Sequence, residues 1–268
     1  MKLRKFFFSS VLLCALFLSK KLEAYSFNTE RFIRLSKPIS LSVGPRIYWK
    51  KRHVYNGACT KGFLEGFDIK FDRTKRGSIY WASLFNYAWG KATGTTGGGA
   101  FSKAIVADYS LEGRLGYSIQ PVLRDTLFLT PYVGFGYYQS KYRFVEPSVP
   151  ELDYYYKNPY LSTGFLFSRF LRPWVSLGLN FCVQFAFDGK RCLKIADSYS
   201  KAPVDNEMQY IIELPFTYQV SKKEKGFGMQ LVPFFEYRHY GGRISGIATF
   251  IDTRFIIAGI NARATYRF

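Results

Sequence analysis

Apolar and polar residues alternate along most of the chain, in segments of about ten residues or more. In the clearest segment, 174–188, every second residue from Val175 to Phe187 is apolar, and the residues between them are small or polar. Segments 105–120 and 208–220 repeat the pattern, with charged residues among the polar positions. A period of two residues is typical of a β-strand with one apolar and one polar face. The pattern therefore predicts an all-β protein.

Ten segments carry this alternation and are predicted to be strands. They cover residues 39–52, 63–73, 78–90, 103–120, 126–139, 159–171, 174–188, 207–220, 227–240 and 253–268. Short turns are expected near 74–77, 121–125, 172–173 and 221–226, and long loops near 53–62, 91–102, 140–158, 189–206 and 241–252. An even number of strands with short periplasmic turns and longer outer loops is typical of outer-membrane barrels. We therefore expect a transmembrane antiparallel up-and-down β-barrel of about ten strands over residues 39–268.

A soluble sandwich or lipocalin-like barrel is the alternative fold. Strands in globular proteins are usually five to six residues long, and a dry core would not tolerate the isolated charges on the polar face. The apolar face is instead rich in Phe, Tyr and Trp, which suits contact with lipid. We expect Trp49 and Trp89 at the outer strand ends, and Trp81 and Trp174 near the inner ends. Together they would form the aromatic girdles of a membrane barrel.

The N-terminus is predicted to be a signal peptide covering residues 1–24. It has three basic residues near the start, an apolar core over residues 6–18, and Ala24 at the expected cut. An uncleaved membrane anchor is the alternative. Residues 25–38 show no clear alternation and are expected to form an N-terminal periplasmic extension or a plug.

The last residues alternate to the very end of the chain, with Ile260, Ala262, Ala264, Tyr266 and Phe268 on one face. This resembles the C-terminal strand of Gram-negative outer-membrane β-barrel proteins, which typically ends in Phe. The resemblance implies that Tyr266 and Phe268 are an assembly signal read by the barrel-assembly machinery. It also implies location in the outer membrane, in contact with outer-membrane lipid and lipopolysaccharide.

In size, the chain is similar to the omptin-like barrels, which include surface proteases. That resemblance would imply paired acids and an Asp-x-His arrangement at the outer rim. The two histidines, His53 and His239, both lack an Asp two residues before them. A lipid-modifying rim enzyme would have to use His239 with Ser or acid partners, and Asp252 is among the acids that could approach it. No such spacing is recognisable, so we expect no enzyme activity, no cofactor and no metal site.

Composition and charge narrow the classes further. Aromatic residues make up 19% of the 268 residues, which excludes a disordered chain. Beyond the N-terminus no uncharged run reaches the roughly 18 residues of a transmembrane helix. The formal charge of +19 falls to +15 when the five basic residues and one acid of segment 1–24 are removed. Basic residues are spread over both rims and the lumen, so we expect anionic lipid headgroups or small anionic solutes as partners and no nucleic acid.

Charges on the polar face are predicted to line the lumen. These pore-lining candidates are Arg46, Lys70, Asp108, Glu112, Arg114, Glu213, Glu236, Arg238 and Arg263. They could form a narrow porin-like channel for small solutes, with anions favoured by the arginine excess. Alternatively they pair with one another and close the lumen, which leaves a structural or surface-display barrel for adhesion or envelope architecture. Barrels of about eight strands are filled by side chains, so ten strands would leave only a narrow pore. The sequence favours the channel, with the closed barrel as the alternative.

Three cysteines remain after residue 24. Cys59 and Cys192 fall in expected outer loops, and Cys182 falls on the lumenal face. An oxidising compartment would allow a disulfide between Cys59 and Cys192. Unpaired cysteines are the alternative.

Overall fold

The computed structural model describes residues 39–75, 77–119, 127–146, 152–172, 174–187, 189–195, 198–203, 208–220, 226–245 and 248–268. The expected signal peptide (1–24) and N-terminal extension (25–38) lie outside the described residues. The regular secondary structure of the described part consists of strands. Across these residues, no helix has the length and apolar character needed to cross a membrane.

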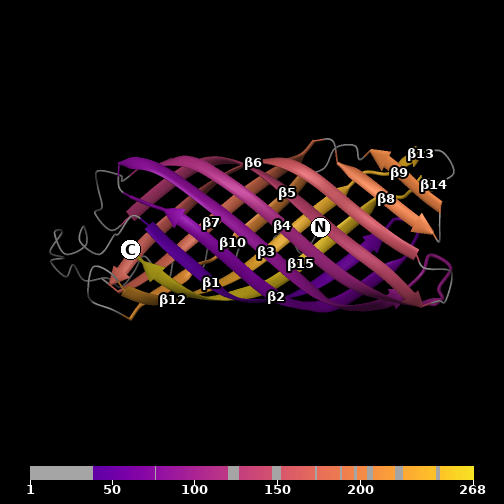
Figure 1. Ribbon diagram of the computed structural model, residues 1–268, viewed down its shortest axis with the longest axis horizontal. Coiled ribbons are helices and arrows are strands. Elements are labelled where there is room, and N and C mark those ends of the chain that lie inside the picture. The colour runs from indigo at the N-terminus through magenta and orange to yellow at the C-terminus, as the bar shows by residue number, and fades with distance from the viewer. Residues whose placement is uncertain are drawn as a thin grey trace, which may run out of the picture.

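Ten strand positions form one closed wall (Figure 1). They are β1 (Ile39–Val54), β2 (Cys59–Arg73), β3 (Ser78–Thr95), β4 (Phe101–Ser118), β5 (Leu127–Glu146), β6 (Leu152–Arg172), β7 (Val175–Ala186), β10 (Met208–Glu213) with β11 (Phe216–Gln219), β12 (Gly226–Tyr240) and β15 (Thr253–Arg267). Each strand pairs antiparallel with its neighbours, and β15 pairs with β1, where Ile47 lies opposite Ile260. The predicted ten-strand antiparallel barrel is confirmed.

The eighth wall position is divided into β10 and β11 by a proline. Pro215 has no backbone N–H to donate to the ladder. The ladder nevertheless continues through the break, because the N–H of Gly178 donates to the Pro215 carbonyl at 2.7 Å. On the other side, the N–H of Leu214 donates to the Pro233 carbonyl at 2.9 Å. The wall therefore stays closed at this point.

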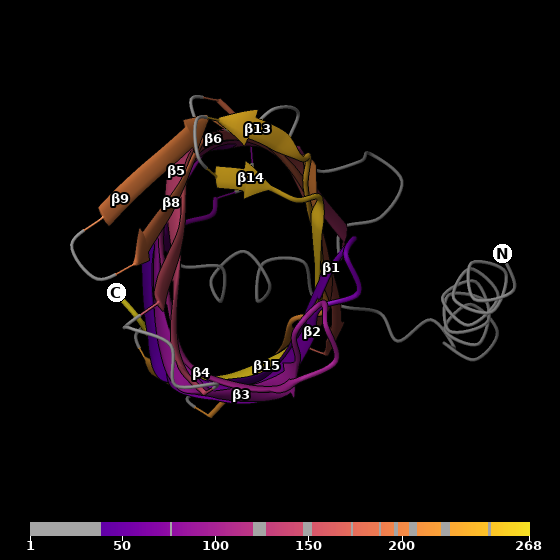
Figure 2. The ribbon, with the colours of Figure 1, turned by 90° about the vertical axis from the view of Figure 1, so that its right-hand side faces the viewer.

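Two further hairpins extend the wall. They replace the long loops predicted near 189–206 and 241–252, and that prediction is wrong. They are β8 (Lys190–Ile195) with β9 (Ser198–Pro203), and β13 (Arg243–Ser245) with β14 (Ala248–Phe250). Lys190 pairs with Pro203 in the register in which Phe185 pairs with Met208, so β8 and β9 continue β7 and β10. β13 and β14 continue β12 and β15 in the same way. In the view along the barrel axis, β9 lies outside the ring of strands and β14 inside it (Figure 2).

The other loops expected at the same end are also shorter than predicted. β1 and β2 run up to a turn over residues 55–58, and β3 and β4 up to a turn over residues 96–100. Gly57 and Gly99 supply the positive φ angles of 89° and 84° that these tight turns require. The ends of β2 and β3 were not predicted because their exterior carries the exposed residues Lys61 and Lys91, so no apolar face marks these segments. We call this the loop end of the barrel.

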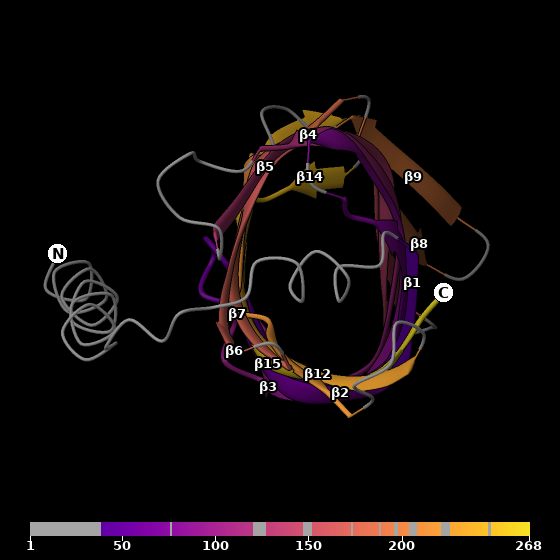
Figure 3. The same cartoon turned by 90° about the vertical axis from the view of Figure 1, so that its left-hand side faces the viewer.

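The opposite end, the terminal end, holds both ends of the barrel sequence (Figure 3). There the N–H of Phe268 donates to the Ile39 carbonyl at 3.1 Å. The Tyr266 ring packs on Phe227 and Phe268, with centroids 4.9 and 5.1 Å apart. The C-terminal residue therefore completes the seam between β1 and β15. Its role as an assembly signal stays a prediction.

The barrel is apolar outside and polar inside. Exterior side chains such as Ile47, Leu115 and Val133 are 50%, 58% and 61% exposed, whereas Asp108 and Arg114 inside are 6% exposed. So much exposed apolar surface would be unfavourable in water and suits a lipid environment. This is the architecture of an outer-membrane β-barrel, in agreement with the expected fold and location.

The four tryptophans lie at the two edges of the apolar exterior. Trp49 and Trp89 are followed on the same face by Lys51 and Lys91, where the exterior becomes charged. Trp81 and Trp174 lie at the terminal end, Trp81 opposite Arg73 and Trp174 just before β7. Trp49 and Trp89 were expected at the outer strand ends. This expectation is wrong, because β1 and β3 continue beyond them.

Candidate functional site in the barrel lumen

All nine predicted pore-lining residues face the interior, where most of them are buried or half-buried within ion pairs. Arg114 Nε donates to Glu112 Oε1 at 2.8 Å, and Arg238 pairs with Glu236 in the same way. Arg263 pairs with Asp68, with Nη2 3.0 Å from Oδ2. Lys70 lies 3.0 Å from Asp72. The structure therefore brings the charges together as pairs rather than as open rings.

Glu112 on β4 accepts hydrogen bonds from several buried side chains in the lumen. Besides Arg114, it accepts hydrogen bonds from Ser162 at 2.7 Å, from Tyr160 at 3.2 Å and from Gln184 at 3.4 Å. These donors come from β6 and β7, so the carboxylate links three strands. Moving this carboxylate would be unfavourable, because each broken hydrogen bond would leave a buried polar group unsatisfied.

Lys50 is a second centre of the network, and it is not among the predicted pore-lining residues. Its Nζ lies 2.7 and 2.8 Å from the two oxygens of Asp108, and it also donates to Ser140 at 2.9 Å and Tyr138 at 3.1 Å. Tyr48 donates to Asp108 at 2.6 Å. Since Lys50 and Tyr48 lie on β1 and Asp108 on β4, these contacts run across the lumen. Both residues lie within the predicted strand 39–52, and counting every second residue from Arg46 along its lumenal face would have found them.

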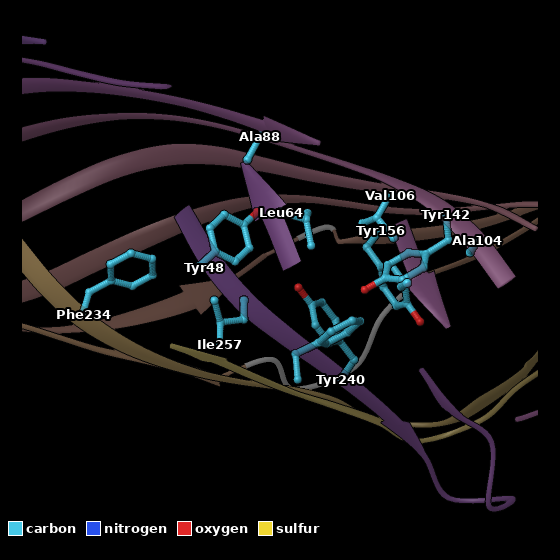
Figure 4. Packing of buried hydrophobic residues seen from close by; sticks show 12 residues of the cluster. Tyr48, Leu64, Ala88, Ala104, Val106, Tyr142, Tyr156, Phe234, Tyr240 and Ile257 are labelled. Carbon is cyan, nitrogen blue, oxygen red and sulfur yellow. The ribbon is translucent and has the colours of Figure 1, made fainter. Parts of the chain in front are cut away.

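An aromatic layer lies toward the loop end of this ionic network (Figure 4). Tyr156 packs on Tyr240 and Phe255, with ring centroids 5.0 and 5.1 Å apart, and Tyr142 packs on Phe255 at 6.2 Å. These four side chains are at most 1% exposed. They come from β5, β6, β12 and β15 and meet in the middle of the barrel. Tyr156 falls in the loop expected near 140–158, which is wrong because β6 begins at Leu152 and its even-numbered positions point inward.

Arginines hold the aromatic layer from two sides. Arg52 of β1 donates from Nε to the Tyr156 hydroxyl at 3.0 Å. Arg191 of β8 lies over the rings of Tyr156 and Tyr240, with Cζ 5.9 and 5.7 Å from their centroids. Its guanidinium donates to the carbonyls of Ile251 and Gly241, at 2.9 Å to Ile251. Arg191 thus ties the β8–β9 hairpin to the connection between β12 and β15.

Open space remains mainly at the terminal end. A cavity of about 160 Å³ lies there, and its polar lining includes Lys70, Asp72, Arg114, Glu213 and Arg263. The spaces deeper in the lumen are far smaller, about 50 and 20 Å³. Glu213 borders the larger cavity and accepts a hydrogen bond from Asn180 at 2.7 Å. The lumen therefore has a vestibule at one end and packed side chains at the other.

The rim histidine has the acid partner that the sequence analysis considered. His239 Nε2 lies 2.7 Å from Asp252 Oδ2, on the exterior at the loop end. Asp252 also faces Arg254, at 3.7 Å. Within the described residues there is no group of three or more His, Cys, Asp or Glu side chains that could hold a metal ion. The absence of enzyme activity stays a prediction.

The cysteines do not form the expected bridge. Cys59 at the start of β2 pairs with His53 and Thr95, whereas Cys192 on β8 pairs with Tyr155 of β6. Both thiols are free, and so is that of Cys182, which faces the lumen as predicted. The two strands belong to different sectors of the wall, which separates the two thiols.

No protein-family model matches the chain, and no curated protein matches it either. Among solved structures, it is similar to the β-domain of the Bordetella autotransporter BrkA, with 14% identity, a TM-score of 0.42, and coverage of 87% of this chain and 100% of that one. It is also similar to the translocator domain of the autotransporter NalP from Neisseria meningitidis, with 9% identity, a TM-score of 0.46, and coverage of 86% and 88%. An outer membrane channel from Pseudomonas putida F1 shows 9% identity, a TM-score of 0.39, and coverage of 92% and 100%. At sequence identities this low, the functions of these proteins cannot be transferred to the chain.

Proposed function

We propose that this outer-membrane barrel has a closed lumen and serves as a rigid support for the strands at its loop end, in adhesion or envelope architecture. The alternative, a narrow porin-like channel for small anionic solutes, would need a continuous polar passage. The packed ionic and aromatic layers favour closure, because each contains side chains from several sides of the barrel.

The contact between Arg52 and Tyr156 carries the proposal. β1 and β6 are five positions apart around a wall of ten, so they are on opposite sides of the barrel. A hydrogen bond between them crosses the full width of the lumen. Tyr240 and Phe255 pack against the same Tyr156 ring from the remaining side.

Opening a passage would require separating buried partners. Breaking a buried ion pair by removing one member typically costs about 3–5 kcal/mol, because an uncompensated charge is left behind. A route past Tyr156 would meet the pair of Lys50 with Asp108 and the pair of Arg238 with Glu236. Closure by these groups would be stable against thermal fluctuations.

The vestibule supports the channel as the second candidate. It places Arg114 and Arg263 beside a cavity of about 160 Å³, where a small anion could be held. The aromatic layer would then have to move for the anion to pass. In that case conduction should depend on Tyr156 and Arg191 rather than on the vestibule.

Planar bilayers holding the refolded barrel distinguish the two functions. We expect the wild type to be silent. Conductance steps should appear only when both layers are removed, by Tyr156→Ala and Arg191→Ala together with Lys50→Ala, Asp108→Ala, Glu236→Ala and Arg238→Ala. Lys194→Gln, at an exposed position of β8, is the control and should remain silent. Heat-modifiable migration on gels should show that all three proteins form barrels. Discrete, anion-selective steps from the wild type would overturn closure and support the channel.

A further inference from the structure

Four lysines form a row across the exterior of β1–β4 at the loop end. Lys51 on β1 lies directly opposite Lys61 on β2. Thr93 of β3 pairs with Lys61 on one side and with Lys103 of β4 on the other. Lys91 is two residues from Thr93 on the same face, so it lies diagonal to both. We call Lys51, Lys61, Lys91 and Lys103 the lysine row.

The row is poorly compensated by acids. Like charges directly opposite each other on a sheet are destabilising. Lys103 reaches Glu146 at 3.4 Å. Across the residues that the structure describes, no ion pair is formed by Lys51, Lys61 or Lys91. The acid nearest along β2 on this face is Glu65, and Phe63 separates it from Lys61.

The lysine row follows the edge of the apolar exterior. Trp49 and Phe63 form the residue pair next to Lys51 and Lys61, on the side of the apolar exterior. Trp89 precedes Lys91 by two residues on the same face. Amphipathic aromatics concentrate at the interface between lipid and water. The lysine side chains therefore lie at the depth of the lipid headgroups in the leaflet at the loop end.

We propose that the lysine row binds the phosphate groups of anionic lipid in that leaflet. An ammonium group is a compact donor of three hydrogen bonds and pairs well with phosphate. Phe63 and Ile105, which are 70% and 46% exposed, lie opposite Lys91 on its two neighbouring strands. They offer an apolar surface beside the charges, which a lipid would use and a free phosphate ion would not. The proposal is independent of whether the lumen is closed.

Another sector of the same rim provides a matched control. On β5 and β6, Lys141 and Arg143 lie 2.9 and 3.4 Å from Asp153, and Tyr155 donates to that carboxylate at 2.9 Å. Burial raises the pKa of Asp153, but the hydrogen bonds from Lys141 and Tyr155 outweigh it, and the pKa lies below its ordinary value. Lys141 and Arg143 therefore already share an acid partner within the protein, and the third cation of this sector, Lys157, lies over the Tyr155 ring at 5.5 Å.

The test measures lipid binding by the refolded full chain in a neutral detergent. The thermal unfolding midpoint is followed while phosphatidylglycerol, phosphatidylcholine or inorganic phosphate is added. A ligand that binds only the folded state raises this midpoint by mass action. We expect phosphatidylglycerol to stabilise the wild type, and the other two probes to have little effect. A combined variant, Lys51→Gln, Lys61→Gln and Lys91→Gln, should need about 100-fold more phosphatidylglycerol, since each lysine near an anionic surface contributes about a fivefold gain.

The control removes the same number of charges from β5 and β6, through Lys141→Gln, Arg143→Gln and Lys157→Gln. Its response to phosphatidylglycerol should stay within about twofold of the wild type. Equal responses from the wild type and the lysine-row variant would overturn the proposal, and so would an equal loss in the control. Stabilisation by inorganic phosphate to the same extent would overturn the assignment to lipid. If the combined variant fails to fold, Lys61→Gln alone should still weaken the response, by about fivefold.

Discussion

Arg52 and Tyr156 join opposite walls of the barrel through a hydrogen bond of 3.0 Å from the guanidinium to the phenol. Both side chains are withdrawn from solvent, Arg52 at 8% and Tyr156 at 0% exposure. The pair therefore connects β1 and β6, which are not neighbours in the wall, across the lumen. Removing either partner therefore tests stability and closure at once.

Tyr156→Phe should lower the free energy of unfolding by about 1–2 kcal/mol, because the buried guanidinium of Arg52 loses its acceptor. Urea unfolding of the barrel in detergent micelles measures this change. Tyr109→Phe on the exterior of β4 is the control and should change the free energy by less than about 0.5 kcal/mol. Equal effects of the two substitutions would contradict a structural role for the cross-barrel bond.

Glu112→Gln should be more damaging, at about 3–5 kcal/mol, because the charge of Arg114 remains buried without its partner. Replacing both residues, Glu112→Leu with Arg114→Leu, should restore much of the loss, since no unpaired charge is left. Glu65→Gln on the exterior serves as the control. A loss below about 1 kcal/mol for Glu112→Gln would show that water reaches Arg114 freely and that the lumen is more open than described.

Gly66→Ala should prevent the barrel from closing. A Cβ at this position would lie 1.9 Å from the Tyr87 carbonyl oxygen and 2.5 Å from the Cα of Ala88, so the backbone of β3 would have to shift. Gly98→Ala, in the turn after β3, meets nothing within 4 Å and should fold normally. Migration on gels with and without heating distinguishes a closed barrel, which is heat-modifiable, from a chain that fails to close. A heat-modifiable Gly66→Ala barrel would show that β2 and β3 can move apart at this point.

The thiols provide a test of the cysteine arrangement. Cys59 is half-buried and should react with a maleimide in the folded barrel, whereas Cys182 and Cys192 are 0% and 2% exposed and should react only after unfolding. Mass spectrometry of the labelled protein counts the modified sites. Migration on gels should not change with reductant. A reductant-sensitive shift would instead support the bridge between Cys59 and Cys192.

Alternation was sufficient to predict the wall, because lipid on one side and a filled lumen on the other impose opposite polarity on successive residues. It failed where that contrast disappears. At the loop ends of β2 and β3 the exterior carries Lys61 and Lys91, so no apolar face marks residues 59–62 and 91–95 as strand. The aromatic layer was missed for a related reason. Tyr142 and Tyr156 are large aromatics on the lumenal face, and a sequence pattern cannot separate them from aromatics that contact lipid.

The nine lumenal charges were predicted as a set, but their pairing was not. Arg263 of β15 pairs with Asp68 of β2, although the two residues are 195 positions apart in the chain. Such partners depend on how far neighbouring strands are staggered around the barrel. Stagger is a property of the closed cylinder and leaves no trace in the spacing of residues within a single strand.

The position of the vestibule makes the two ends of the barrel chemically different. In the closed state the lumen is accessible only from the terminal end, with Lys70 and Arg263 beside the vestibule and the ionic network, followed by the aromatic layer, closing it from the loop end. A small water-soluble reagent that enters at the terminal end could reach Lys70, while the same reagent at the loop end would meet only the rim. The two sides of the membrane would thus face chemically different surfaces of the same barrel, an accessible polar vestibule on one side and a closed rim on the other.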